Sequence, residues 1–115
     1  KLLLKMKKEE NRISSYEFNA VKLFRSSDSA ILSTVSVKHE GYPFGSLVTY
    51  ISGNCRTAYL YLSDIAQHTK NFLNNSKSCL TIINMNQDKQ NSERLTLLGD
   101  LTPLSKDKFE EWCSE

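Results

Sequence analysis

The sequence has few of the features that mark the specialised classes of protein. Among its 115 residues are only 4 glycines and 2 prolines, and 39% of the side chains are hydrophobic. This composition excludes collagen-like, low-complexity and wholly disordered chains. No apolar run approaches the roughly 18 to 20 residues that a membrane-spanning helix requires. The length therefore indicates one globular domain, which should bury roughly 65% of the surface of its unfolded chain.

Charge and cysteine content exclude further classes. The 15 basic and 13 acidic residues leave a net charge of +2, so the overall field predicts no binding to nucleic acid or to a membrane surface. The three cysteines form no CxxC pair and have no histidine at metal-ligand spacing, which is typical of free thiols in a reducing compartment. The apolar run at residues 2–4 is shorter than the roughly 7 to 15 residues of a signal peptide. We therefore expect a cytoplasmic protein.

The familiar catalytic motifs are also missing. The sequence contains no GxSxG, phosphate-binding loop, HExxH or GxGxxG pattern, and this absence removes support for several enzyme classes. Its two histidines are too few to form a zinc site alone. His39 falls in a predicted turn, where we expect a solvated side chain. His68 falls in the first turns of a short predicted helix, where backbone N–H groups favour an anion, although a solvated helix face explains it equally well.

Capping patterns predict two helices in the first two thirds of the chain. Ser14 and Glu17 match a capping box that begins a helix ending near Arg25. Asp64 and Gln67 match a second capping box that begins a short helix. The short helix should bury three apolar side chains and end within residues 74–76; the three are Ile65, Phe72 and Leu73. A last helix is predicted over residues 105–112, after a polar loop over residues 87–92.

Five strands are predicted from β-branched residues and from the turn residues between them. They cover residues 30–37, 42–51, 57–62, 77–84 and 94–101. Links of hairpin length join the first three strands, with Gly41 in the first turn. Such links force antiparallel pairing, because a parallel return needs a dozen residues or more. Closure removes exposed sheet edges, so we predict an α+β fold built on a small antiparallel barrel.

Three segments, taken together and in order, resemble one known superfamily. They are GYPFGSLVTY at residues 41–50, YLYLSDIAQHTKNF at 59–72 and RLTLLG at 94–99. They are similar to the FMN-binding split barrels of the pyridoxamine 5′-phosphate oxidase superfamily, and within it to the haem-utilisation (HugZ-type) subgroup. The resemblance implies a six-stranded Greek-key split barrel with short flanking helices over residues 14–115, after an N-terminal extension over residues 1–13 and with a C-terminal helix cut short.

The resemblance also implies a homodimer that binds its cofactor in a groove between two subunits. The family cofactor is FMN, with haem as the alternative, and no metal site is implied within this chain. The positions carried over from the family as cofactor-binding are Ser46, Leu47, Val48, Tyr61, Leu62, Ser63, His68, Thr69, Lys70 and Arg94. Of these, His68, Thr69 and Lys70 would meet the phosphate at the start of the short helix. Arg94 would meet a haem propionate or the flavin phosphate, and an exposed strand arginine is the competing interpretation.

The sequence departs from the true oxidases at three positions, where Ser46, Gln67 and His68 replace an arginine and an Arg-Lys pair of the family. Pyridoxamine-phosphate oxidation is therefore not expected, and the axial histidine of the haem subgroup belongs to a segment beyond residue 115. Two kinds of function stay open. One is a flavin-linked oxidoreductase or haem-degrading protein with unknown catalytic residues, and the other is a non-catalytic flavin or haem store. A nucleic-acid-binding barrel ranks last, because few basic residues lie among the aromatics of residues 41–63.

Overall fold

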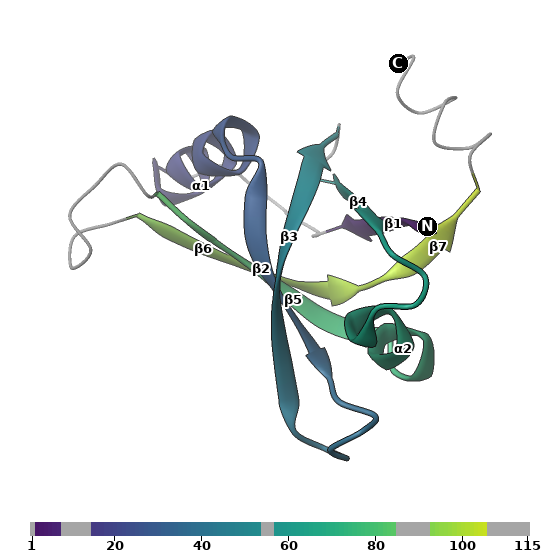
Figure 1. The fold of residues 1–115 in the computed structure, drawn as a ribbon. Coiled ribbons are helices and arrows are strands. Elements are labelled where there is room, and N and C mark those ends of the chain that lie inside the picture. Colours follow the sequence, from purple (N-terminus) through teal and green to yellow (C-terminus); the bar gives the residue numbers. More distant parts are fainter. Residues whose placement is uncertain (1, 8–14, 54–56, 85–92, 106–115) are drawn as a thin grey trace.

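The computed structural model describes residues 2–7, 15–53, 57–84 and 93–105. The described residues form two helices and seven strands, which Figure 1 shows as one curled sheet with a helix near each end. In chain order they are β1 (Leu2–Lys7), α1 (Ser15–Ser26), β2 (Ser29–Val35), β3 (Pro43–Ser52), β4 (Thr57–Leu62), α2 (Gln67–Asn74), β5 (Lys77–Ile83), β6 (Arg94–Asp100) and β7 (Thr102–Leu104).

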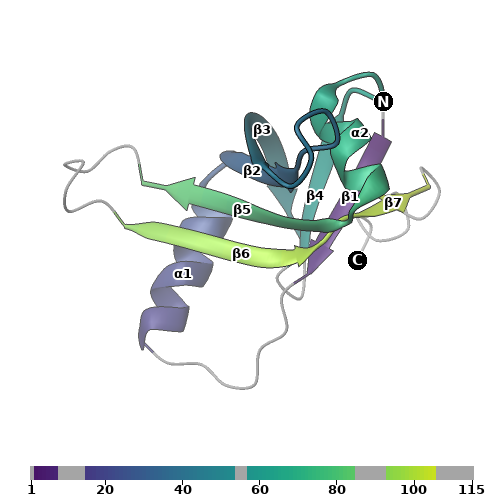
Figure 2. The same cartoon turned by 90° about the horizontal axis from the view of Figure 1, so that it is seen from below.

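The strands form a sheet in the order β6-β5-β2-β3-β4-β1-β7. All of its pairings are antiparallel. The sheet curls so that β1 and β6 approach each other, although they are not neighbours in the sheet. Figure 2 shows α1 lying against the β5–β6 hairpin at one end, and α2 at the opposite end of that hairpin. The predicted α+β class and antiparallel barrel are confirmed, and the predicted strands of residues 30–101 agree with β2 to β6 within two residues at each end.

Two strands were not predicted as strands. Residues 2–7, which the sequence placed in an N-terminal extension, form β1 and pair with β4 along its whole length. β7 then pairs with the other side of β1, so that the sheet has seven strands rather than six. Three leucines in a row carry no alternating pattern, and only pairing with the distant β4 makes this segment a strand. Pro103 in β7 is compatible with its position at the sheet edge, where a missing N–H disrupts no ladder.

The turn between β2 and β3 forms as the sequence predicted. Gly41 has a φ of 84°, a left-handed conformation that glycine adopts without steric cost. The backbone N–H of Tyr42 donates to the His39 carbonyl at 3.0 Å, and that of Ser36 donates to the Tyr42 carbonyl at 2.8 Å. His39 is exposed in this turn, as expected.

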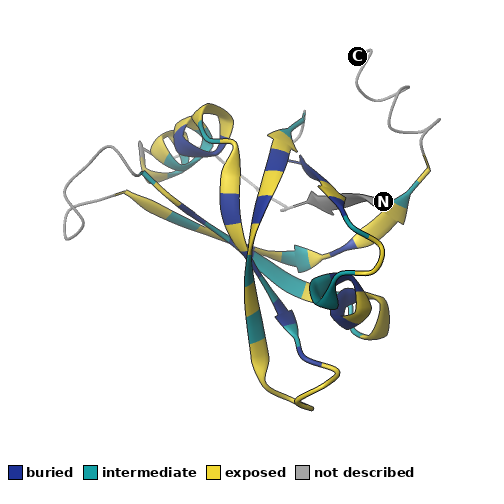
Figure 3. Cartoon of the chain, viewed as in Figure 1, coloured by how far each residue is buried: buried dark blue, intermediate teal, exposed yellow. Residues whose placement is uncertain are grey.

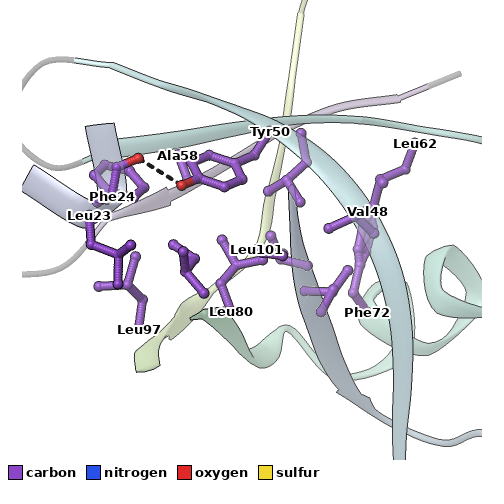
Figure 4. Close-up of a cluster of buried hydrophobic side chains, with 14 residues drawn as sticks. Leu23, Phe24, Val48, Tyr50, Ala58, Leu62, Phe72, Leu80, Leu97 and Leu101 are labelled. Atoms are coloured by element: carbon purple, nitrogen blue, oxygen red, sulfur yellow. Dashed lines mark hydrogen bonds between the residues drawn. The ribbon is translucent and has the colours of Figure 1, made fainter. Parts of the chain in front are cut away.

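The core fills the concave side of the sheet (Figure 4). Strand alternation directs one set of side chains inward, and Leu32, Leu60 and Leu80 among them are fully buried. The helices close the ends of the core. The whole cluster consists of Leu23, Phe24, Ala30, Leu32, Val48, Tyr50, Ala58, Leu60, Leu62, Phe72, Leu80, Ile82, Leu97 and Leu101.

The short helix α2 differs from its prediction. Its N-cap is Ala66, which makes no side-chain capping bond, so the predicted Asp64–Gln67 capping box is wrong. The Gln67 side chain turns along the helix and donates to the Asn71 Oδ1 atom at 3.1 Å. Phe72 is buried as predicted.

The two other apolar side chains predicted to be buried on α2 are exposed. Ile65, just before the helix, is 80% exposed and Leu73 is 61% exposed, so this part of the prediction is wrong. The reason is that polar side chains fill the positions facing the barrel. Three further predictions fall outside the described residues. They are the capping residue Ser14, the polar loop over residues 87–92 and the part of the last helix after Ser105.

Candidate functional site

The inward side of α2 carries a histidine that contacts the barrel wall. The Nδ1 atom of His68 lies 3.0 Å from the Oγ atom of Ser46 on β3. Ser46 precedes the buried Val48 by two residues and therefore lies on the inward side of β3. Two positions that the sequence assigned to one site, Ser46 and His68, are thus brought together although 22 residues separate them.

The environment of His68 favours its neutral form. Its Nε2 atom is buried and has no hydrogen-bond partner within the part of the chain that the structure describes. Burial lowers the pKa of His68 below its ordinary value of 6.5, because a desolvated imidazolium loses its hydration. The docked ring is therefore harder to protonate than a solvated imidazole.

Two further polar side chains attach α2 to the barrel. Thr69 is fully buried and donates its hydroxyl to the Ser63 carbonyl, which closes the loop before the helix. Asn71 is also fully buried. Its Nδ2 atom donates to the Thr34 Oγ1 atom at 3.1 Å, and its Oδ1 atom accepts from the Val37 N–H at 3.0 Å.

Asn71 was not identified from the sequence as a functional or structural residue. The available signal was an asparagine inside a short helix, where asparagine is unfavourable unless its side chain is bonded elsewhere. Because its amide bridges α2, β2 and the turn after β2, it determines the position of the helix. We name His68, Thr69 and Asn71 the polar anchor of α2.

The outward side of the sheet carries a second feature, a set of large apolar side chains in contact with solvent. We name it the exposed apolar face; Figure 3 shows exposed residues along β3 and β6, where part of it lies. Leu47 is 74% exposed and Leu98 is 72% exposed. The face consists of Ile31, Leu47, Ile51, Tyr61, Ile83 and Leu98.

The strand register places these side chains on one side of the sheet. Ile31 on β2 lies directly opposite Leu47 on β3, and directly opposed residues point to the same side. Ile51 is four residues after Leu47 on the same strand, so it shares that side. Exposed apolar side chains that adjoin one another, as Ile31 and Leu47 do, are typical of binding or subunit interfaces.

The structure separates the ten predicted cofactor-binding residues into five groups. Ser46, Ser63, His68 and Thr69 lie around α2, whereas Leu47 and Tyr61 belong to the exposed apolar face. The side chains of Val48 and Leu62 are in the core, so they are unavailable to a ligand. Lys70 is exposed on α2. Arg94 is exposed at the start of β6, where it pairs with Ile83 at the end of β5 that lies away from α2.

Two of the residues around α2 that the sequence assigned to a phosphate have partners within the chain. The His68 ring is directed to Ser46, and the Thr69 hydroxyl is used by the Ser63 carbonyl. Only Lys70 supplies a cation on the helix itself, and Arg94 lies at the far end of the β5–β6 hairpin. Arg94 is thus separated from the side chains of α2 that the sequence assigned to a phosphate.

Two other kinds of site are absent from the described ranges of the chain. No cluster of three or more His, Cys, Asp or Glu side chains suited to a metal ion occurs there. No helix in the described part of the chain has the length and apolar character needed to cross a membrane.

The geometry agrees with a known family of split barrels. Residues 14–114 match the family described as "CREG, beta-barrel". The chain therefore belongs to this family, and its split-barrel fold of the pyridoxamine 5′-phosphate oxidase type is confirmed.

Individual relatives extend this comparison. The chain is 38% identical over 76 residues to the non-canonical haem oxygenase HOZ from the chloroplast of Arabidopsis thaliana. The aligned segment covers 66% of this chain and 23% of the relative. It thus spans about a quarter of that relative's length. A haem-binding protein from Mycobacterium smegmatis superposes with a TM-score of 0.72 at 26% identity, over 91% of this chain and 43% of the other. The haem storage protein HutZ from Vibrio cholerae gives a TM-score of 0.64 at 26% identity, over 82% of this chain and 66% of HutZ.

Proposed function

We propose that this chain is a haem-binding module, in which haem lies against the exposed apolar face and a second copy of the chain covers the resulting groove. The observation that carries the proposal is the exposed apolar face itself, with Leu47 and Leu98 both more than 70% exposed. Relatives that bind, store or degrade haem by name support the same ligand.

The chemistry of the face suits a porphyrin. Haem is a broad apolar plate with two carboxylates, so its binding requires apolar contact area and a cation at the edge. Leu47 and Ile31 provide adjacent apolar side chains on β3 and β2. Arg94 comes four residues before Leu98 on the same outward side of β6. A guanidinium binds a carboxylate through two parallel hydrogen bonds.

The described strands of the face hold the ring without an iron ligand of their own. β2, β3, β5 and β6 contain no histidine, and the His68 ring is directed to Ser46. Haem, when bound, supplies the redox chemistry of its iron, and the protein supplies apolar contact, orientation and exclusion of water. Binding is therefore the function that these residues support, whereas turnover depends on groups outside the described residues.

FMN is the less favoured ligand. It requires a phosphate clamp, and the two groups best placed to form one at α2, His68 and Thr69, are bonded within the chain. The homodimer is supported by the same apolar face, because a single chain would leave it in water.

The test is a titration of haemin and of FMN into ligand-free protein, followed by absorption spectroscopy and light scattering. We expect a Soret band that saturates at micromolar haemin, no flavin binding in that range, and a dimer mass. Leu47→Ser should weaken haem binding at least tenfold and shift the mass toward the monomer. Leu73→Ser, at a 61% exposed leucine on α2, is the matched control and should change neither. A monomer without a Soret band, or haem binding unaffected by Leu47→Ser, would contradict the proposal.

A further inference from the structure

We propose that the Ser46–His68 contact is a proton-sensitive latch that holds α2 on the barrel and releases it in acid. The proposal does not depend on haem binding, because it rests on the contacts of α2 alone. It concerns the only member of the polar anchor that can change charge, since Thr69 and Asn71 are neutral at all pH values of interest.

The latch follows from the two ring nitrogens of His68. In the neutral ring, Nδ1 can donate to or accept from the Ser46 hydroxyl, which lies 3.0 Å away. The buried Nε2 atom then has no partner among the described residues. In the protonated ring both nitrogens carry hydrogen, so the docked position would bury a charged Nε2–H without an acceptor. The docked helix therefore selects the neutral ring.

No charged side chain on the supporting strands can compensate for a protonated ring. α2 packs against β2 and β3, and these strands contain no Asp, Glu, Lys, Arg or His. Their one titratable group is Tyr50, whose hydroxyl donates to the Phe24 carbonyl at 2.7 Å. The other titratable groups of the neighbouring segments are Lys38, His39 and Glu40 in the β2–β3 turn, Asp64 and Lys70 beside and on α2, Tyr59 and Tyr61 on β4, and Lys77 and Cys79 on β5.

The expected pH dependence follows from linkage. Burial lowers the pKa of His68 in the docked state, so the released state binds a proton more readily than the docked state. Docking is then fully favoured above pH 6.5 and is weakened as the pH falls below that value. One proton can raise the released fraction by at most tenfold per pH unit.

Release would act on the strand that carries the exposed apolar face. Ser46 lies on the inward side of β3, and its neighbour Leu47 lies outward in that face. Phe72 and Asn71 remain as contacts of α2 after the His68 ring leaves. The latch is therefore expected to loosen α2 and β3 rather than to unfold the barrel.

Two measurements on the full chain test the latch. The first is an NMR titration of the His68 ring, which should show a midpoint below 6.5. The second is hydrogen exchange of the α2 amides at pH 7.5 and 5.5, corrected for intrinsic exchange, which should show more frequent opening at pH 5.5. His68→Asn retains a neutral amide near the Nδ1 position and should abolish this difference. His39→Asn, in the exposed turn, is the matched control and should leave the difference unchanged.

Each measurement can overturn the proposal separately. A His68 midpoint at or above 6.5 would show that the docked state does not exclude the proton. The same pH response of α2 in the His68→Asn variant and in the unmodified chain would place the proton elsewhere. Because the NMR titration uses the unmodified chain, a His68→Asn variant that fails to fold still leaves the proposal open to disproof.

Discussion

The two helices of this barrel are attached to it by different kinds of contact. α1 inserts Leu23 and Phe24 into the core, where they are 5% and 2% exposed. α2 contributes a single core side chain, Phe72, and is otherwise held by its polar anchor of His68, Thr69 and Asn71. Apolar contacts are non-directional, whereas buried polar contacts are stabilising only when every group is paired. α1 is therefore held by the packing of apolar side chains, and α2 mainly by the geometry of its hydrogen bonds.

This difference has a functional consequence. A helix held mainly by apolar contacts is insensitive to protonation near neutral pH. The titratable group that bonds to α1, the Tyr50 hydroxyl, has a pKa raised to about 12 and keeps its proton there. A helix held by hydrogen bonds can respond to a proton when one of the bonded groups is a histidine. α2, the region where the family resemblance places cofactor contacts, is thus the part of the fold that can change without loss of the core.

Phe24→Ala is expected to have the largest effect on stability. Phe24 is buried and its ring stacks on Tyr50 with centroids 5.3 Å apart. Its truncation should lower the free energy of unfolding by about 4 kcal/mol, measured by urea denaturation at pH 7. Phe18→Ala removes a 63% exposed ring from the same helix and should change the stability by less than about 0.5 kcal/mol. A similar loss in both variants would show that α1 is not fixed by its core contacts.

Asn71→Ala should rank second and should act mainly on α2. It leaves the Val37 N–H without its acceptor and removes the bond that the Thr34 hydroxyl accepts, although that hydroxyl can still donate to the Phe44 carbonyl. An unpaired buried group costs roughly 1 to 3 kcal/mol. We expect a loss of about 3 kcal/mol by urea denaturation, with faster hydrogen exchange concentrated in residues 67–74. Asn74→Ala, on the exposed end of the same helix, is the control. A loss spread evenly over the barrel would contradict the role of Asn71 as an anchor of α2.

The contrast between the helices also explains which parts of the fold could be predicted. Strands β2 to β6 were predicted because alternation and turn residues are local signals, and Gly41 has the turn conformation expected of it. β1 was missed because its pairing with β4 is a contact between distant parts of the chain. The exposure of Ile65 and Leu73 was missed for a related reason, since the residues of α2 that face the barrel are polar.

The candidate site was predictable in composition but not in geometry. The resemblance brought Ser46 and His68 to attention, and the structure shows them in contact. The resemblance could not show that the His68 ring is directed to Ser46. Leu47 was identified as a cofactor position, but the exposed apolar face that it joins depends on the register of β2 with β3, which a one-residue slip would reverse.

Tyr50→Phe should have a smaller effect at neutral pH and a clear one in alkali. The Tyr50 hydroxyl donates to the Phe24 carbonyl at 2.7 Å, and burial raises the pKa of Tyr50 from 10.0 to about 12. The native chain should therefore lose roughly 2 to 3 kcal/mol of stability as the pH rises from 10 to 12, because the unfolded state releases its proton first. Tyr50→Phe should lose about 1 kcal/mol at pH 7 and lack this alkaline loss.

Urea denaturation at several pH values between 7 and 12 measures both effects of the tyrosine substitution. Tyr42→Phe, at a 71% exposed position in the β2–β3 turn, is the control and should retain the alkaline loss. An equal alkaline loss in Tyr50→Phe would assign the titration to another group and would separate Tyr50 from the attachment of α1.

Lys70→Ala should have the smallest effect of these substitutions. Lys70 lies between two members of the polar anchor in sequence, Thr69 and Asn71, but its side chain is exposed. If α2 is held by its inward side chains, the substitution should change the stability by less than about 0.5 kcal/mol and leave the exchange of the α2 amides unaltered. If the outward side of α2 instead binds a phosphate, inorganic phosphate should stabilise the native chain but not the Lys70→Ala variant. A thermal-shift titration with phosphate distinguishes these outcomes, and we expect no stabilisation of either protein because the His68 and Thr69 donors are already bonded within the chain.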